Sequence, residues 1–168
     1  MNIKKIEKND RDLLLNFFSE LVIADPERVE RPEDVNKITK DDEEKWIEKR
    51  LTKENDKEIF VLCGLDETGK IVTEGEVERM TRWVEKHVAE IRFGVLPNHE
   101  LIAEVMLENL IETAKNNNIE VLIYFHLETQ KKGIEIMEKL GFESAGVIKK
   151  YYKKGDKYIN RIYLVKYL

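Results

Sequence analysis

The segment that most constrains the fold is residues 121–127, Val-Leu-Ile-Tyr-Phe-His-Leu, which shows no polar alternation until His126. An apolar run of this length without alternation is typical of a strand that is buried on both faces. It follows a long helical pattern and precedes a shorter one that ends at Gly141-Phe142. Strands joined through a buried helix usually lie parallel, so this order predicts a parallel pair inside a mixed sheet.

The helical pattern before this strand covers residues 99–116. Its glutamates recur every fourth residue and predict one solvent-facing stripe, made of Glu100, Glu104, Glu108 and Glu112. Apolar residues cover much of the remaining surface, so we expect this helix to be largely buried. The shorter helix after the strand ends in a glycine followed by an apolar residue, the pattern of a left-handed helix stop.

The rest of the chain predicts further strands and two more helices. Strands are expected at residues 3–6, 59–63, 71–80 and 85–95, and two in the tail around a hairpin turn at 153–156. Helices are expected after Asp10, which we expect to cap the first, and after Asp41 and Asp42, with an irregular crossover at residues 25–39 between them. The sequence therefore predicts one α/β (α+β) domain over residues 1–168, with a mixed sheet of about seven strands and about four helices.

Composition narrows the classes of function. The net charge of −5 argues against a protein that wraps nucleic acid. An acidic balance mildly favours cationic substrates such as amines, although solubility is the simpler explanation. No apolar stretch is long enough to span a bilayer, and no secretory leader opens the sequence, so we expect no membrane contact.

The cysteine and histidine content bears on metals and on the cellular compartment. Cys63 is the single cysteine, which excludes an internal disulfide and fits a reducing, cytoplasmic environment. The three histidines show no ligand spacing with it, so we expect no metal site. Cys63 lies in an apolar run, where a small buried side chain is the better interpretation than a nucleophile.

Three segments together resemble the GNAT superfamily of N-acetyltransferases, and the resemblance covers nearly the whole chain. Residues 89–97, Ala-Glu-Ile-x-Phe-x-Val-x-Pro, resemble the family's central strand, which pairs with the pantetheine arm of coenzyme A. The spacing from that strand to Ala114-Lys115 resembles the family's cofactor helix. The family's Asn-x-x-Ala-x-x-x-Tyr-x-x-x-Gly-Phe positions are occupied here by Gln130, Gly133, Met137, Gly141 and Phe142.

The resemblance implies a GNAT-like fold and transfer of an acetyl group from acetyl-CoA to a primary amine by direct attack. The amine would belong to a small molecule or a peptide, and a homodimer through the last two strands is compatible with the sequence. Glu90, five residues before Val95 on the matching strand, is the first candidate for the base that takes the ammonium proton, followed by Glu78 on the neighbouring strand. The positions expected to bind the cofactor are Phe93, Gly94, Val95, Asn98, His99, Ala103, Gln130 and Gly133.

The phosphate-binding loop departs from the family's pattern, Arg/Gln-x-x-Gly-x-Gly/Ala. Leu101 replaces the first glycine, and Glu100 adds a negative charge where an anion would lie. Two interpretations stay open, a modified coenzyme A pocket or an ordinary capped helix with Asn98 as its N-cap. Met137 also replaces the tyrosine that protonates the thiolate in many members. Tyr124 or Tyr151 could substitute, although core packing is the simpler role for each.

These departures leave a second function open, a catalytically degenerate GNAT-like domain that serves as a binding or interaction module or as a coenzyme A sensor. Fold does not by itself fix function, so activity has to be argued from the site.

Overall fold

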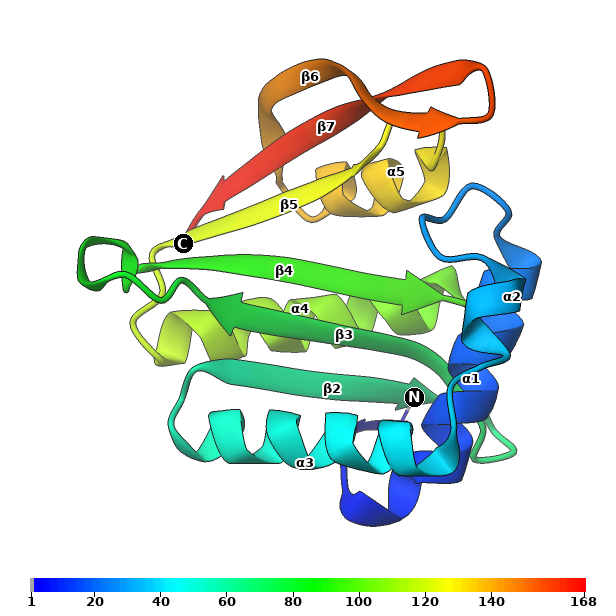
Figure 1. The fold of residues 1–168 in the computed structure, drawn as a ribbon. Helices are drawn as coiled ribbons and strands as arrows, with labels where there is room; N and C mark the ends of the chain where they lie inside the picture. Colours follow the sequence, from blue (N-terminus) through cyan, green and yellow to red (C-terminus); the bar gives the residue numbers. More distant parts are fainter. Residues whose placement is uncertain (1) are drawn as a thin grey trace.

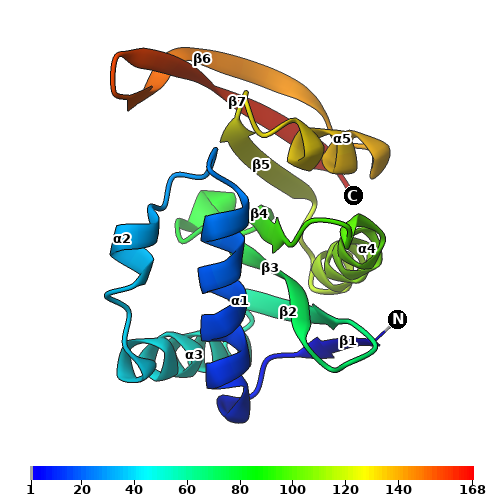
Figure 2. The same ribbon diagram turned by 90° about the vertical axis from the view of Figure 1, so that its right-hand side faces the viewer.

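The computed structural model describes residues 2–168 as a seven-stranded mixed sheet with helices on both faces (Figures 1 and 2). The strands are β1 (Asn2–Lys5), β2 (Ile59–Leu65), β3 (Ile71–Arg79), β4 (Val88–Val95), β5 (Val121–Leu127), β6 (Glu143–Lys154) and β7 (Lys157–Tyr167). The helices are α1 (Arg11–Ala24), α2 (Pro32–Val35), α3 (Lys40–Asn55), α4 (Glu100–Asn116) and α5 (Lys131–Lys139), with 3₁₀ turns η1 (Lys8–Asp10) and η2 (Trp83–Glu85).

The sheet order is β1-β2-β3-β4-β5-β7-β6, and β4 and β5 form the predicted parallel pair. The other neighbouring strands run antiparallel. The mixed sheet and the α/β fold class predicted from the sequence are therefore confirmed.

The helices form two layers. Helices α1, α2 and α3 lie on one face of the sheet, and α4 and α5 lie on the other (Figure 2). Helix α4 packs into one of the two hydrophobic clusters, and its fully buried side chains include Met106, Leu107 and Leu110. Gly75 on β3 allows α4 to approach closely, since a Cβ there would lie 2.7 Å from Met106 Cε and 3.0 Å from Leu110 Cδ1.

Strands β4 and β5 diverge soon after they begin. They pair only over Val88–Glu90 with Val121–Ile123, although β4 continues to Val95 and β5 to Leu127. Helix α1 crosses the far end of β4, where a Cβ on Gly94 would lie 2.4 Å from Leu21 Cδ2. The lack of a side chain at Gly94 thus lets α1 close one side of this fork.

Three local expectations need correction. The crossover at residues 25–39 contains the one-turn helix α2, which begins at Pro32, a residue whose fixed φ suits the first helical position. Strand β4 begins at Val88 because the residues before it form η2. Asp10 occupies the N-cap position of α1, but its carboxylate accepts from Glu7 N at 2.8 Å in the preceding 3₁₀ turn instead of capping the helix.

Asn98 is not the N-cap of α4. It adopts a left-handed conformation with φ of 69°, and the N-cap position falls on His99, which makes no side-chain capping bond. Asparagine tolerates positive φ better than other residues with a side chain, so Asn98 shapes the turn after Pro97.

Among residues 2–168, no helix is both long and apolar enough to cross a bilayer.

The buried face of α4 should dominate its contribution to stability. We expect Leu110→Ala to lower the free energy of unfolding by about 2–5 kcal/mol, because Leu110 is fully buried and its loss leaves a cavity. Leu101→Ala is the matched control on the same helix, since Leu101 is 64% exposed and its loss should cost less than about 0.5 kcal/mol. Urea denaturation of both variants measures the difference, and equal losses would contradict the packing described.

Candidate active site

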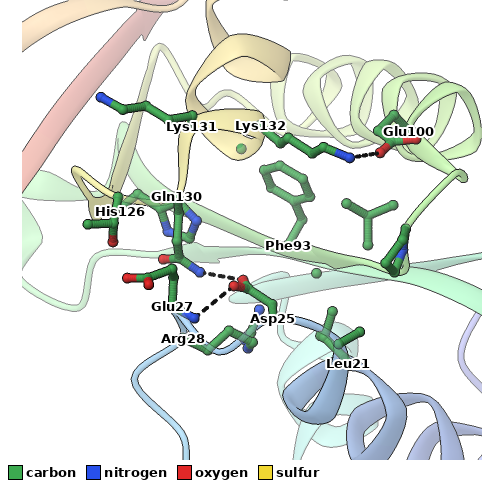
Figure 3. Close-up of a pocket in the computed structure, with 16 residues that line it drawn as sticks. Leu21, Asp25, Glu27, Arg28, Phe93, Glu100, His126, Gln130, Lys131 and Lys132 are labelled. Carbon is green, nitrogen blue, oxygen red and sulfur yellow. Dashed lines mark hydrogen bonds and ion pairs between the residues drawn. The ribbon is translucent and has the colours of Figure 1, made fainter.

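The fork between β4 and β5 opens into a cavity of about 310 Å³, bounded by the end of α1 and the start of α5 (Figure 3). Five residues that the sequence nominates for cofactor binding line it: Phe93, Gly94, Val95, Gln130 and Gly133. The structure thus brings together the β4 and α5 parts of the expected site, which are more than thirty residues apart in the chain.

The other three nominated residues do not line this cavity. Asn98 is exposed, His99 is at the N-cap position of α4, and Ala103 is fully buried in the core. Leu101, which replaces a family glycine, is 64% exposed and is also absent from the wall. Of the altered loop, Glu100 is the residue that reaches the cavity.

The backbone of β4 offers free hydrogen-bonding groups to the fork. The amide of Leu96 donates to Val72 O, and this bond shows which residues of β4 direct their backbone groups towards β3. Because bonding direction alternates along a strand, Gly94 bonds towards β3, and the backbone groups of Phe93 and Val95 face the fork. These groups lie beyond the last residue of β4 that pairs with β5, Glu90.

Gly133 at the start of α5 keeps the floor of the cavity open. A Cβ at this position would lie 2.9 Å from Tyr124 Oη and 3.0 Å from His126 Nε2. Tyr124 Oη is buried, and no hydrogen-bond partner for it exists in the described part of the chain, residues 2–168. Burial raises the pKa of Tyr124, partly opposed by the charge of Arg28, so this hydroxyl stays a proton donor at neutral pH.

Two lysines at the start of α5 add positive charge to the cavity. Lys131 and Lys132 both line it, and Lys132 Nζ lies 2.9 Å from Glu100 Oε1 (Figure 3). The hydrogen bond from Lys132 is the main cause that lowers the pKa of Glu100, so Glu100 is ionised at neutral pH. Neither lysine was predicted from the sequence. The chain is rich in lysine, and only the position of these two just after Gln130 distinguishes them from the others.

The segment after α1 forms the opposite wall. Asp25, Glu27 and Arg28 line the cavity, and Gln130 Nε2 donates to Asp25 Oδ2 at 2.8 Å across it (Figure 3). From the sequence, this wall was predicted only as an irregular crossover of mixed charge. Its place at the fork depends on where α1 ends relative to β4.

A smaller cavity of about 140 Å³ adjoins the first. The two share Arg28, Phe93, His126 and Gln130, and the smaller one adds Arg92, Tyr124 and Tyr152. The fork therefore forms a cleft with two connected chambers, and we use the term cleft for both together.

The two nominated carboxylates lie beside the cleft and do not line either chamber. Glu78 and Glu90 face each other across the β3–β4 ladder, with Arg92 next to both. Arg92 Nη2 lies 2.6 Å from Glu78 Oε2, and Arg92 Nη1 lies 3.2 Å from Glu90 Oε1. Since Arg92 lines the smaller chamber, it connects these carboxylates to the cleft.

Their environments separate the two carboxylates in basicity. Burial raises the pKa of Glu90 and outweighs the opposing charges of Arg92 and Arg161. Burial also acts on Glu78, but hydrogen bonds from Lys53 and Arg92 outweigh it and lower the pKa of Glu78. Glu90 is therefore the stronger base of the pair.

Within the described residues, no group of three or more histidine, cysteine, aspartate or glutamate side chains is arranged to hold a metal ion.

The chain was compared with protein families, with proteins of curated function and with solved structures. The model of the acetyltransferase (GNAT) domain matches residues 3–163. No protein of curated function matches the chain significantly in sequence.

Solved structures share the fold over the full length of the chain. A ribosomal-protein-alanine N-acetyltransferase from Brucella melitensis aligns with a TM-score of 0.83 at 22% identity, covering 100% of both chains. A GNAT-family acetyltransferase from Streptococcus pneumoniae aligns with a TM-score of 0.85 at 18% identity, covering 99% of each chain. A phosphinothricin acetyltransferase from Sinorhizobium meliloti, solved in complex with AcCoA, aligns with a TM-score of 0.81 at 16% identity, covering 99% of this chain and 88% of that one.

The cleft wall should make folding stability depend on pH through His126. Burial, helped by Arg28, lowers the pKa of His126 to about 4, so the folded protein holds the neutral imidazole. The unfolded chain takes up a proton near pH 6.5, so stability falls as the pH drops from about 6.5 to about 4, by up to about 1.4 kcal/mol per pH unit. Urea denaturation at a series of pH values should show this slope for the wild type and a reduced slope for His126→Gln. The same slope in both proteins would contradict a half-buried His126 that stays neutral in the folded protein.

Proposed function

The chain belongs to the GNAT acetyltransferase family, and we propose that it transfers an acetyl group from acetyl-CoA to a primary amine in the cleft between β4 and β5. The observation that carries the proposal is the fork itself, a cavity lined by Phe93, Gly94 and Val95 where the strand edge of β4 has no partner strand. A cleft of this size and mixed lining is within the range of small-molecule sites.

The residues of the cleft fit the parts of acetyl-CoA. The unpaired backbone groups of Phe93 and Val95 suit the amides of the pantetheine arm, which can add to the edge of β4 as a strand does. Lys131 and Lys132 supply positive charge for the phosphates, beside the backbone amides in the first turn of α5. In this proposal the α5 lysines take over the role that the glycine loop before α4 has in the family.

Glu100 is the residue that opposes this fit, because its carboxylate lies at the same end of the cleft. Its pairing with Lys132 must open before a phosphate can take the lysine. The exchange replaces one charge-assisted hydrogen bond by another of similar strength, so it limits affinity without preventing binding.

When bound, acetyl-CoA supplies an activated acetyl thioester. In the reaction the bond from carbon to nitrogen forms, the bond from carbon to sulfur breaks, the nitrogen loses a proton and the sulfur gains one. A backbone amide of β4 that faces the fork would stabilise the negative charge that develops on the carbonyl oxygen.

The two proton transfers fall to different residues. Glu90, whose raised pKa suits a base near neutral pH, would take the proton from nitrogen through water, because its side chain stops short of the cleft wall. Tyr124 would donate the proton to sulfur, since its buried hydroxyl finds no partner among residues 2–168 and lies next to Gly133. This places the acid on β5 instead of at Met137 on α5.

A second candidate function is a GNAT-like module that binds a coenzyme A ester without turning it over. One observation favours it: neither Glu90 nor Glu78 lines the cleft directly. Binding and turnover measured on the same protein separate the two functions.

Lys132 should be required for tight binding of acetyl-CoA. We expect Lys132→Ala to weaken binding at least tenfold, about 1.4 kcal/mol, because it removes a phosphate partner and leaves Glu100 unpaired nearby. Lys139→Ala is the matched control, since Lys139 makes the other pair from α5 to α4, with Glu104 at 2.5 Å. Isothermal titration calorimetry compares the two variants. Equal losses would show that the cations of the cleft do not bind the phosphates.

The activity is tested with acetyl-CoA and a panel of primary amines, including peptides and small molecules. We expect amine-dependent release of the coenzyme A thiol, followed with a thiol reagent, because Cys63 is buried and should give little background. Glu90→Gln should lower kcat at least tenfold and remove the rise of kcat with pH, and Tyr124→Phe should lower kcat with little change in KM.

Binding of acetyl-CoA, with no release of the coenzyme A thiol in the presence of any amine tested, would favour the module that binds without turnover. An unchanged kcat in Glu90→Gln would remove Glu90 from the mechanism.

A further inference from the structure

A separate cavity of about 310 Å³ lies on the other side of α1, between α1, α3 and β3. We call it the α1–α3 cavity. Its lining includes three aromatic rings and three carboxylates, from Phe17, Phe18, Trp46, Asp42, Glu43 and Glu74. Its size is at the lower end of the range for small-molecule sites.

This cavity is distinct from the cleft. The two have no lining residue in common. Phe17 lines the α1–α3 cavity, and Leu21, one turn later on α1, lines the cleft. Both side chains pack on Gly94, so α1 forms the partition between the two spaces.

Glu74 has a buried carboxylate oxygen that residues 2–168 leave without a partner. Its neighbours on the same face of β3 are paired, Glu76 with Arg50 at 3.2 Å and Glu78 with Lys53 at 2.5 Å. Glu74 Oε1 is buried, and residues 2–168 provide it with neither a hydrogen bond nor an ion pair. An ionised carboxylate in this state is costly, so burial, and next the charge of Glu76, raise the pKa of Glu74 to about 8. A cation that enters the cavity favours the ionised form and gains an ion pair that the protein does not itself supply.

The charges of the lining favour a positive ligand. The side chains that line the cavity include three carboxylates and no lysine or arginine. Asp42 is already engaged by the hydroxyl of Thr39 at 2.6 Å, in the cap of α3. Among residues 2–168, Glu43 and Glu74 therefore remain the lining carboxylates without a side-chain partner, and Glu74 is the one with a fully buried oxygen.

The aromatic rings define the rest of the ligand. Phe17, Phe18 and Trp46 present apolar faces that suit an aryl or alkyl group, and aromatic faces also attract ammonium ions. Arg50 shows this attraction within the protein, because its guanidinium lies 4.4 Å from the centre of the Trp46 ring.

We propose that the α1–α3 cavity is a binding site for a primary ammonium ion carried on an aryl or alkyl group. The ammonium pairs with Glu74, and the apolar group packs among Phe17, Phe18 and Trp46. This site is additional to the cleft and does not depend on acetyl transfer.

The test uses Trp46 as a reporter. The chain has two tryptophans, and Trp83 is 86% exposed, so Trp83→Phe leaves Trp46 as the single tryptophan at little structural cost. In this background we expect 2-phenylethylamine to change the Trp46 fluorescence saturably near neutral pH. Glu74→Gln should weaken this binding at least tenfold while leaving the weaker binding of the neutral 2-phenylethanol unchanged.

Glutamine has the shape of a protonated glutamate, so Glu74→Gln preserves the packing of the cavity. Glu108→Gln, on the exposed stripe of α4, is the control for loss of one carboxylate elsewhere. Lys132→Ala is the control for the cleft, and it should leave the affinity for the amine unchanged even where it weakens acetyl-CoA.

Three results would overturn the proposal: no saturable change with the amine, equal affinity for the amine and the alcohol, or equal affinity in the Glu74→Gln and wild-type backgrounds. None of them bears on the acetyl-CoA titration, so failure of this site and failure of the proposed function are separately observable.

Discussion

The early separation of β4 from β5 is the constraint on which the rest of the structure depends. The two strands hold each other over three residue pairs, and then the backbone of β4 continues without a partner strand on that side. Unpaired backbone groups away from water are costly, so the fork favours any ligand that can complete the edge. Helix α1, the start of α5 and the segment after α1 surround this edge, and the bond between Gln130 and Asp25 joins two of these walls.

Charge is distributed unevenly between the two faces of the sheet. The face under α4 is apolar, whereas the face under α1 and α3 carries Glu74, Glu76, Glu78, Glu90 and Arg92. Most of these carboxylates are matched by cations from α3 or by Arg92, which fixes α3 against β3 and holds Glu78 ionised. Two carboxylates keep raised pKa values: at Glu90 burial outweighs its pair with Arg92, and at Glu74 burial and the charge of Glu76 outweigh the nearby cations. The same imbalance supports the proposed role of Glu90 as a base and the proposed pairing of Glu74 with a cationic ligand.

The sequence predicted the order of strands and helices well, because hydrophobic periodicity depends on residues that are close together in the chain. The apolar run at residues 121–127 forms β5, an interior strand of the sheet, and the four-residue glutamate spacing marked the solvent-facing side of α4. It also nominated five residues that meet at the fork from two distant segments.

What the sequence could not predict depends on tertiary placement. Asp25 and Arg28 reach the cleft only because α1 ends beside Gly94, and no local pattern encodes that meeting. In the sequence, Lys131 and Lys132 cannot be distinguished from the many surface lysines. They line the cavity because the first turn of α5 lies beside it. The prediction of Asn98 as the N-cap of α4 was wrong because it considered the side chain alone. Asparagine is a common N-cap residue, but the positive φ of Asn98 places the N-cap at His99.

The central claim is that the free edge of β4 binds the pantetheine arm of acetyl-CoA. Amide resonances of a ¹⁵N-labelled sample, recorded as acetyl-CoA is added, test it directly. The account predicts the largest shifts at Phe93 and Val95 and at Lys131–Gly133, with small shifts on β1 and β2 at the other side of the sheet. Saturable binding that leaves the β4 amides unmoved and shifts another surface would contradict it.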